Sequence, residues 1–194
     1  GWPAGFKRRG CPGRALFVSG PSMNIADDDF TLFGLAPRYA LDRSELDQRW
    51  RALQSRAHPD RFASEGGAAQ RLAMQWAVRI NQAYRRLRDP IQRGAYLCEQ
   101  RGAPIDAERN TAMPAEFLVQ QLHWREALDQ AHGESAVRAL DDEVAAFERT
   151  LLQRLQDQLD GQHDAVAASH TVRALMFVAR FRSNIDQRLE ALEE

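Results

Sequence analysis

Cysteine is scarce in this chain of 194 residues, which contains only Cys11 and Cys98. Two cysteines so far apart exclude a disulfide framework, a four-cysteine zinc site and an iron–sulfur cluster held by this chain alone. The five histidines show no metal-ligand spacing, so we expect no metal and no cofactor. Cys98 shares one face of a predicted helix with Ile91 and Ala95, which predicts a buried thiol rather than a reactive one.

Long apolar runs and an excess of one charge are also absent. No run reaches the roughly 18 residues that a membrane span needs, so we expect no membrane segment. The net charge is −1, which excludes an overall positive field that would recruit nucleic acid. The charge is nevertheless uneven, because residues 1–22 carry +4, residues 23–101 carry +3 and residues 102–194 carry −8. This asymmetry suggests two domains with different partners, and compositional drift between solvated surfaces is the alternative.

The first residues are predicted to be a disordered tail over 1–28, because Gly, Pro, Ser and Arg dominate its beginning. Its apolar run Leu16-Phe17-Val18 is too short for the core of a signal peptide. Met23 is a plausible true start of the chain. We therefore expect a bacterial cytoplasmic protein, with a mitochondrial presequence as the less favoured interpretation of the Arg-rich stretch.

Apolar residues recur with helical spacing from Asp29 nearly to the C-terminus, and no segment alternates with period two, so we expect an all-α fold. Asp42 and Glu45 resemble a capping box that opens one helix, and Pro59 ends that helix because it disfavours helical backbone at the preceding residue. The last three helices are expected to form an antiparallel three-helix bundle. The predicted helices cover a short turn at 30–35 and then 43–58, 69–88, 91–101, 115–131, 135–160 and 164–192.

The tripeptide His58-Pro59-Asp60 stands at the turn between two antiparallel amphipathic helices. Pro59 fixes φ and forces a sharp exit from the first helix, so that His58 and Asp60 project from the tip of a helical hairpin. There Asp60 can accept hydrogen bonds from a partner's arginine, and His58 can donate or accept. Arginines around this tip would steer it towards an acidic surface. An ordinary turn beside a solvated arginine face is the alternative.

Residues 29–101 resemble the J-domain, the co-chaperone module that stimulates ATP hydrolysis by DnaK-class chaperones. The likeness comprises a short first helix, a basic second helix, the His-Pro-Asp loop, a long third helix and the Asp-Pro-x-x-Arg-x-x-Tyr ending at 89–96. Ala57 and Arg61 stand where most J-domains carry Tyr and Lys, a difference that we expect to shift affinity rather than remove activity. The resemblance implies that the chaperone contacts are His58, Pro59, Asp60, Arg49, Arg51, Arg56 and Arg61.

Five segments resemble one J-protein family in particular. These segments are 30–35 (FTLFGL), 58–62 (HPDRF), 80–84 (INQAY), 116–122 (EFLVQQL) and 171–177 (TVRALMF). The layout over residues 29–192 resembles the HscB family, which is dedicated to iron–sulfur cluster transfer. The resemblance implies a J-domain over 29–101, a linker over 102–113 and a scaffold-binding helical domain over 114–194. It also implies two protein partners, the specialised DnaK-class ATPase HscA and the cluster scaffold IscU, and neither nucleic acid nor a membrane.

The family's scaffold-docking patch falls on the first and last helices of the predicted bundle. Phe117 and Trp124 lie in one narrow stripe that suffices for the core of the first helix, whereas Leu118 and Leu122 lie on a different flank. Such an extra apolar flank indicates a docking surface or, alternatively, packing against the J-domain. His123 and Met176 replace residue types that are common in the family, which affects the polar rim. The implied scaffold contacts are Leu118, Val119, Leu122, Arg125, Glu126 and Phe177.

Three other classes of function stay open at this point. A general J-protein with an unrelated client would keep the hairpin tip and change only the partner of the bundle. An enzyme that used His58 and Asp60 as an acid–base pair would need a concave pocket and an orienting residue, which a hairpin tip does not provide. A structural helical dimer would not need the His-Pro-Asp tip. The sequence therefore predicts a co-chaperone that activates a partner's ATPase, and no enzymatic activity of its own.

Overall fold

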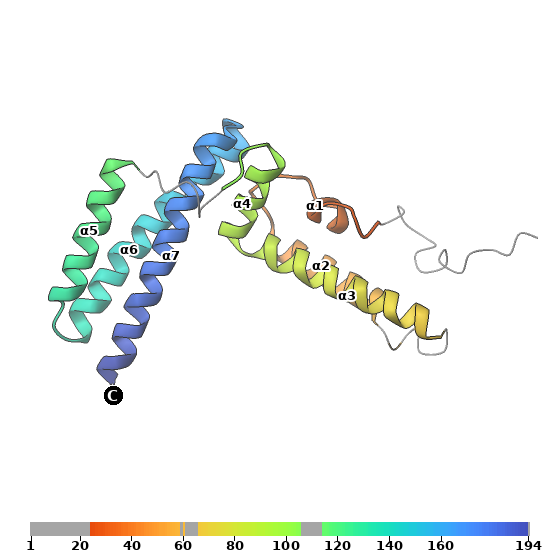
Figure 1. Ribbon diagram of the computed structural model, residues 1–194, viewed down its shortest axis with the longest axis horizontal. Helices are drawn as coiled ribbons and strands as arrows, with labels where there is room; N and C mark the ends of the chain where they lie inside the picture. Colours follow the sequence, from red (N-terminus) through yellow and green to blue (C-terminus); the bar gives the residue numbers. More distant parts are fainter. Residues whose placement is uncertain (1–23, 59, 61–65, 106–113, 194) are drawn as a thin grey trace, which may run out of the picture. The chain divides into compact units, whose positions relative to one another are not determined.

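The computed structural model describes residues 24–58, 60, 66–105 and 114–193 (Figure 1). All the regular elements in these ranges are helices, which confirms the predicted all-α class. By its contacts the chain divides into two compact units. One unit comprises the described residues up to Ala36 together with Ser44–Arg85, and the other comprises Pro37–Arg43 together with the described residues from Arg86 onwards.

The first unit is built from three helices, of which the first is only five residues long. A helix this short is unstable by itself, because its end groups lack partners within the helix. Asp28 compensates at the N-terminus, where its carboxylate accepts from the backbone N–H groups of Phe30 and Thr31. Gly34 closes the C-terminus with a left-handed φ of 63°. The helices are α1 (Asp29–Phe33), α2 (Arg43–Ala57) and α3 (Gly67–Arg88).

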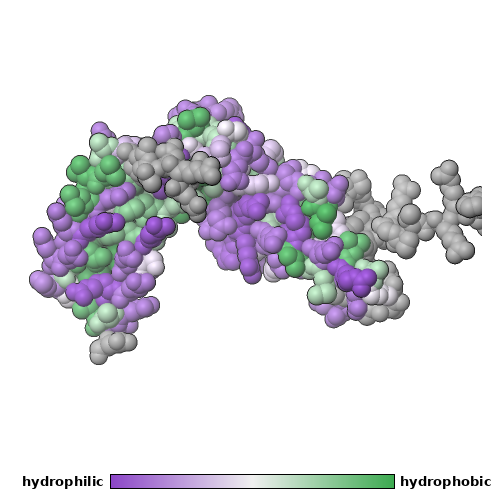
Figure 2. All heavy atoms as spheres, in the orientation of Figure 1, coloured by the Kyte–Doolittle hydropathy of each residue, from purple (hydrophilic) through white to green (hydrophobic). Residues whose placement is uncertain are grey.

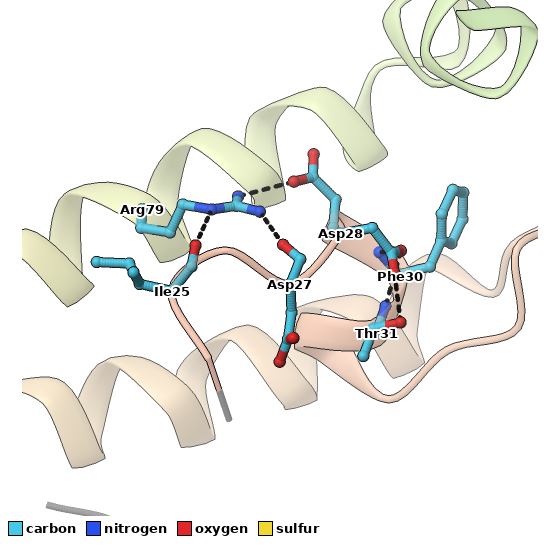
Figure 3. Close-up of polar contacts among 7 residues, drawn as sticks. Ile25, Asp27, Asp28, Phe30, Thr31 and Arg79 are labelled. Carbon is cyan, nitrogen blue, oxygen red and sulfur yellow. Dashed lines mark hydrogen bonds and ion pairs between the residues drawn. The ribbon is translucent and has the colours of Figure 1, made fainter. Parts of the chain in front are cut away.

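Arg79 of α3 ties the segment before α1 to the rest of this unit (Figure 3). Its guanidinium forms an ion pair with the fully buried carboxylate of Asp29 at 2.7 Å. It also donates to the backbone carbonyls of Ile25 at 3.2 Å and Asp27 at 2.6 Å. Residues 24–28 are thus held in a defined turn, which corrects the predicted tail of 1–28 for this part. The remainder of that predicted tail lies outside the described residues.

Polar and aromatic contacts join α2 to α3 along the hairpin. The Trp50 and Tyr84 rings stack with centroids 4.7 Å apart. The side-chain oxygen of Asn81 accepts from Trp50 Nε1 at 3.0 Å and from Gln54 Nε2 at 2.6 Å. A sequence pattern does not reveal this link, because Asn81 is separated from its donors by about thirty residues. One amide therefore satisfies two donors that would otherwise be part-buried without a partner.

The second unit contains α4 (Pro90–Gln100), α5 (Ala115–Gln130), α6 (Glu134–Gln156), a π-helical turn η2 (Asp157–Gly161) and α7 (Ala165–Glu193). In α4, Gly94 allows close packing, because an added Cβ would lie 2.8 Å from Leu155 and 3.2 Å from Val172. These contacts group α4 with the bundle, whereas the J-domain resemblance groups it with α1 to α3. Cys98 is fully buried as predicted, and burial raises the pKa of its thiol to about 11.

The π-helical turn replaces the last predicted turn of the helix over 135–160. Its residue Asp160 accepts from the backbone N–H groups of Tyr39 and Ala40, both at 2.7 Å. The carbonyl of Leu159 accepts from Arg101 Nη1 at 2.5 Å. Wider helical turns of this kind redirect side chains and free backbone carbonyls. Here η2 holds the segment that leads into α2 and the end of α4, so long-range contacts determine a local conformation.

Of the predicted linker over 102–113, the residues up to Ile105 are described. Ala103 and Ile105 are buried, and the carbonyl of Ile105 accepts from Arg173 Nη1 of α7 at 3.0 Å. This first part is thus packed on the second unit rather than solvated, because an arginine on α7 holds its backbone. Residues 106–113 lie outside the described part of the chain.

The amide of Asn81 generates a stability prediction. Asn81→Ala removes the shared acceptor, and we expect it to lower the free energy of unfolding by about 1–3 kcal/mol, because the Trp50 and Gln54 donors lose their partner. Asn81→Asp keeps an acceptor oxygen and should lose less. The neighbouring exposed residue Gln82 supplies a matched control, Gln82→Ala. Urea unfolding followed by circular dichroism measures all three, and equal midpoints for N81A and Q82A would contradict the assigned link.

Candidate interaction surfaces

The hairpin tip exposes the side chains of His58 and Asp60 of the His-Pro-Asp motif. Helix α2 ends at Ala57, one residue before His58, as Pro59 requires. The side chains of His58 and Asp60 are 58 % and 89 % exposed. Such exposure leaves both groups solvated, which suits contact with a partner better than acid–base chemistry. Pro59 and Arg61 lie outside the described residues, so their predicted roles stay predictions.

His58 contacts Asp60 through its ring nitrogen Nδ1. The backbone N–H of Asp60 donates to Nδ1 at 3.3 Å. This contact occupies Nδ1 and leaves Nε2 as the ring nitrogen for a partner. Nδ1 also lies 3.5 Å from Asp60 Oδ2. The tip thus presents a ring nitrogen, Nε2, beside the carboxylate acceptor of Asp60. This pairing of a ring nitrogen and a carboxylate matches a polar partner surface.

The three described arginines of the predicted chaperone face differ in their contacts. Arg51 and Arg56 are exposed on α2. Arg49 instead donates to the carbonyls of Phe33 at 2.7 Å and Gly34 at 2.8 Å. Carbonyls at the end of a helix lack partners within it, so Arg49 secures the C-terminus of α1. Its contact with a chaperone stays a prediction, but its structural role is one that composition and spacing missed.

The outer face of α5 carries three large exposed apolar side chains. Leu118, Val119 and Leu122 are 50 %, 68 % and 58 % exposed, whereas Phe117 and Trp124 on the inner face are buried. Figure 2 shows hydrophobic residues gathered over the N-terminal part of α5. We call Leu118, Val119 and Leu122 the α5 patch. The predicted division of this helix into a core stripe and a separate apolar flank is therefore present in the structure, and Arg125 and Glu126 are exposed beside it.

Phe177, the predicted contact on the last helix, is half-buried rather than free on the surface. Its ring lies edge-on to Phe117 with centroids 5.6 Å apart, and it stacks on Phe181 at 6.4 Å. Trp124 completes this cluster by packing against Phe147 of α6 at 5.1 Å and against Phe181 at 5.8 Å. Phe177 therefore supports the attachment of α5 as well as contributing to the surface near the α5 patch.

Ion pairs stabilise the two helices behind α5. Arg182 of α7 pairs with Asp141 and Glu148 of α6, each at 2.9 Å. These hydrogen bonds to carboxylates raise the pKa of Arg182 above its ordinary value. On α6 itself, Arg138 pairs with Glu134 at 2.6 Å. These arginines are engaged within the protein, so they are poorly placed to bind a partner.

Among the residues that the structure describes, no helix combines the length and the apolar character that crossing a membrane requires. The same part of the chain contains no group of three or more His, Cys, Asp or Glu side chains that could hold a metal ion.

Arg49 and Arg51 supply a matched pair for a test of structural against surface roles. Arg49→Ala should lower the free energy of unfolding by about 1–2 kcal/mol, because the carbonyls of Phe33 and Gly34 lose their donor. Arg51→Ala removes an exposed charge and should change the free energy of unfolding by less than about 0.5 kcal/mol. Thermal unfolding by circular dichroism compares them. Equal melting temperatures for the two variants would refute the structural role of Arg49.

Comparisons with known proteins give a consistent result. Residues 113–186 match the family model described as the HSCB C-terminal oligomerisation domain. The chain is 47 % identical over 161 residues to the co-chaperone protein HscB homolog of Bordetella petrii, covering 82 % of this chain and 95 % of that protein. It is 46 % identical over 174 residues to the homolog of Burkholderia multivorans, covering 88 % and 99 %.

Solved structures show the same similarity in three dimensions. The chaperone HscB from Vibrio cholerae superposes with a TM-score of 0.79 at 37 % identity, covering 85 % of this chain and 99 % of that one. The human co-chaperone protein HscB superposes with a TM-score of 0.81 at 24 % identity, covering 97 % and 94 %, which speaks for the fold alone. These relatives are named as co-chaperones and not as enzymes, which agrees with the exposed tip at His58 and Asp60.

Proposed function

The chain belongs to the HscB family of J-type co-chaperones of iron–sulfur cluster assembly, and from this premise we propose which partners its two surfaces bind. The hairpin tip stimulates the ATPase of a DnaK-class chaperone of the HscA type. The α5 patch, with Phe177, Arg125 and Glu126, binds an iron–sulfur scaffold of the IscU type. The protein delivers the scaffold to the chaperone and so promotes transfer of the cluster, which is the cargo, in the bacterial cytoplasm.

The exposed α5 patch is the observation that carries the scaffold proposal. Three large aliphatic side chains on one helix face are costly to leave in water, and clusters of this kind mark interaction surfaces on proteins. They are not needed for the core, because Phe117 and Trp124 already fill the inner face of α5. The charged side chains of Arg125 and Glu126 provide a polar rim beside the α5 patch.

The chaperone proposal is supported by the chemistry of the tip. Asp60 is a nearly fully exposed carboxylate, which can accept a bidentate pair of hydrogen bonds from an arginine of the chaperone. Arg51 and Arg56 lie exposed on the helix that leads to the tip and would attract an acidic surface. Arg49 contributes by holding α1 against α2.

Separate surfaces explain how one small chain can act as an adaptor. The tip and the α5 patch belong to different compact units, so each partner can bind without occupying the other's surface. When both are bound, the scaffold is held at a high effective concentration near the chaperone. A general J-protein with an unrelated client is the second candidate, and it differs only in the partner of the α5 patch.

The chaperone surface predicts the effect of one substitution at the tip. His58→Gln should abolish stimulation of an HscA-type ATPase, because the imidazole ring beside Asp60 is lost. The fold should survive, since the side chain is exposed. Steady-state ATP hydrolysis by the chaperone, with and without the variant, measures the effect. Full stimulation by the variant would reject the tip as the activating surface, and a circular-dichroism melt provides the control for folding.

The scaffold surface predicts a dissociation of the two activities. Leu118→Ala combined with Leu122→Ala should weaken binding of an IscU-type scaffold, since an apolar anchor at an interface centre typically costs about 1–4 kcal/mol on truncation. Stimulation of the chaperone in the absence of scaffold should remain, and the extra stimulation that scaffold adds should vanish. Isothermal titration calorimetry and ATPase assays measure the two effects.

Val166→Ala is the matched control for this test, because Val166 is 63 % exposed on α7 and lies outside the patch. It should leave scaffold binding unchanged. Phe177→Ala is expected to weaken binding and also to lower the melting temperature, because its ring supports α5. Wild-type affinity in the Leu118/Leu122 variant would place the scaffold elsewhere and would favour the unrelated-client alternative.

A further inference from the structure

A groove lies between the C-terminal parts of α5 and α7. The two helices run in the same direction (Figure 1). Phe117, near the N-terminus of α5, meets Phe177 in the middle of α7, and Trp124 meets Phe181 further along both helices. Beyond these aromatic contacts lies a groove of about 410 Å³, lined by Leu128, Asp129, Asn184, Gln187, Arg188 and Ala191.

Helical spacing connects this groove to the proposed docking surface. On α5, Leu118, Leu122, Arg125 and Asp129 recur at i, i+4, i+7 and i+11, and so occupy one side of the helix. On α7, Phe177, Phe181, Asn184 and Arg188 recur with the same spacing. Both series begin with apolar residues and end with polar ones. Phe181 is buried, so the exposed surface is apolar at Leu118, Leu122 and the half-buried Phe177, and polar at the groove.

The charged groups of the groove differ from Arg182 and Arg138, which are paired within the bundle. Arg182 and Arg138 form ion pairs with carboxylates. Within the described ranges, neither Asp129 nor Arg188 forms an ion pair or a hydrogen bond, and both are exposed. The two groups line the same groove without closing on each other. They are available to a partner of the opposite charge pattern.

The size of protein interfaces indicates what occupies this groove. A stable interface buries about 800 Å² on each partner and involves roughly 20 to 30 residues a side. The α5 patch with Phe177, Arg125 and Glu126 supplies only six, so a scaffold seated on it must also cover neighbouring surface. The α5–α7 groove is neighbouring surface with hydrogen-bonding groups and unpaired charges. Such polar rims set the orientation of a partner rather than the bulk of its affinity.

We propose that the groove of Asp129, Asn184, Gln187 and Arg188 is a second, polar contact for the same iron–sulfur scaffold, and that it sets the orientation of the scaffold on the α5 patch. This inference rests on the proposed function. Asp129 and Arg188 pair with a basic and an acidic group of the scaffold, and the amides of Asn184 and Gln187 hydrogen-bond between them. The apolar end supplies affinity, and the groove discriminates between this client and other proteins with a similar apolar patch.

Charge reversals in the full chain test the groove. Asp129→Arg and Arg188→Asp should each weaken binding of a purified IscU-type scaffold by about fivefold or more, mainly through slower association. Asp129→Asn and Arg188→Gln should weaken it less, in the same direction. Arg149→Asp reverses an exposed charge on α6, away from the groove, and is the matched control. Surface plasmon resonance at low and high salt measures the rates.

A charge swap distinguishes docking from an internal role. If Asp129 and Arg188 supported each other, the double variant D129R/R188D would restore wild-type binding. The proposal expects the swapped protein to bind as weakly as the single reversals, because the charges of the scaffold are unchanged. Restored binding would overturn the proposal, and so would reversals that behave like Arg149→Asp.

The outcomes also separate this inference from the proposed function. Loss of binding in L118A/L122A with normal binding in the groove variants would reject the groove and leave the scaffold surface in place. Normal binding in both sets would reject the scaffold surface itself. Leu118, Leu122, Asp129 and Arg188 are exposed, so we expect unchanged melting temperatures in all these variants. Stimulation of the chaperone without scaffold should stay at the wild-type level.

Discussion

The packing of Trp124 against Phe147 and Phe181 determines how α5 is rotated about its axis. Trp124 is fully buried, and its indole N–H donates to Glu143 at 2.9 Å, so both the position and the orientation of the ring are constrained. Because side chains on a helix are spaced by 100°, this one anchor turns Leu118 and Leu122 outward. The proposed scaffold surface is therefore a consequence of aromatic packing on the opposite side of the same helix.

Arginines serve two distinct purposes in the first unit. Arg49 and Arg79 satisfy backbone carbonyls around the five-residue α1 and the turn before it, where no regular helix could provide donors. Arg51 and Arg56 stay exposed on α2. A basic composition alone would assign all of them to a partner surface. The structure instead assigns Arg49 and Arg79 to nearby carbonyls, and only the exposed Arg51 and Arg56 are left for the proposed steering of a chaperone.

Two surfaces with different physical character suit two different partners. The tip presents a ring nitrogen and a carboxylate, whose interaction with a partner is polar and sensitive to salt. The α5 patch presents aliphatic side chains, whose interaction depends on the area removed from water. The aliphatic contacts of the α5 patch are therefore less sensitive to salt than the polar contacts of the tip.

The amino-acid sequence by itself determined the helical class, the end of α2 before Pro59 and the two-sided character of α5, because capping, proline geometry and apolar spacing act over a few residues. Only the tertiary structure decided that α4 packs on α7 through Gly94, that η2 is a π-helical turn, and that Arg49 holds α1. It also decided that Phe177 supports α5. Each of these depends on atoms far apart in the chain, and local propensity carries no information about which distant groups will meet.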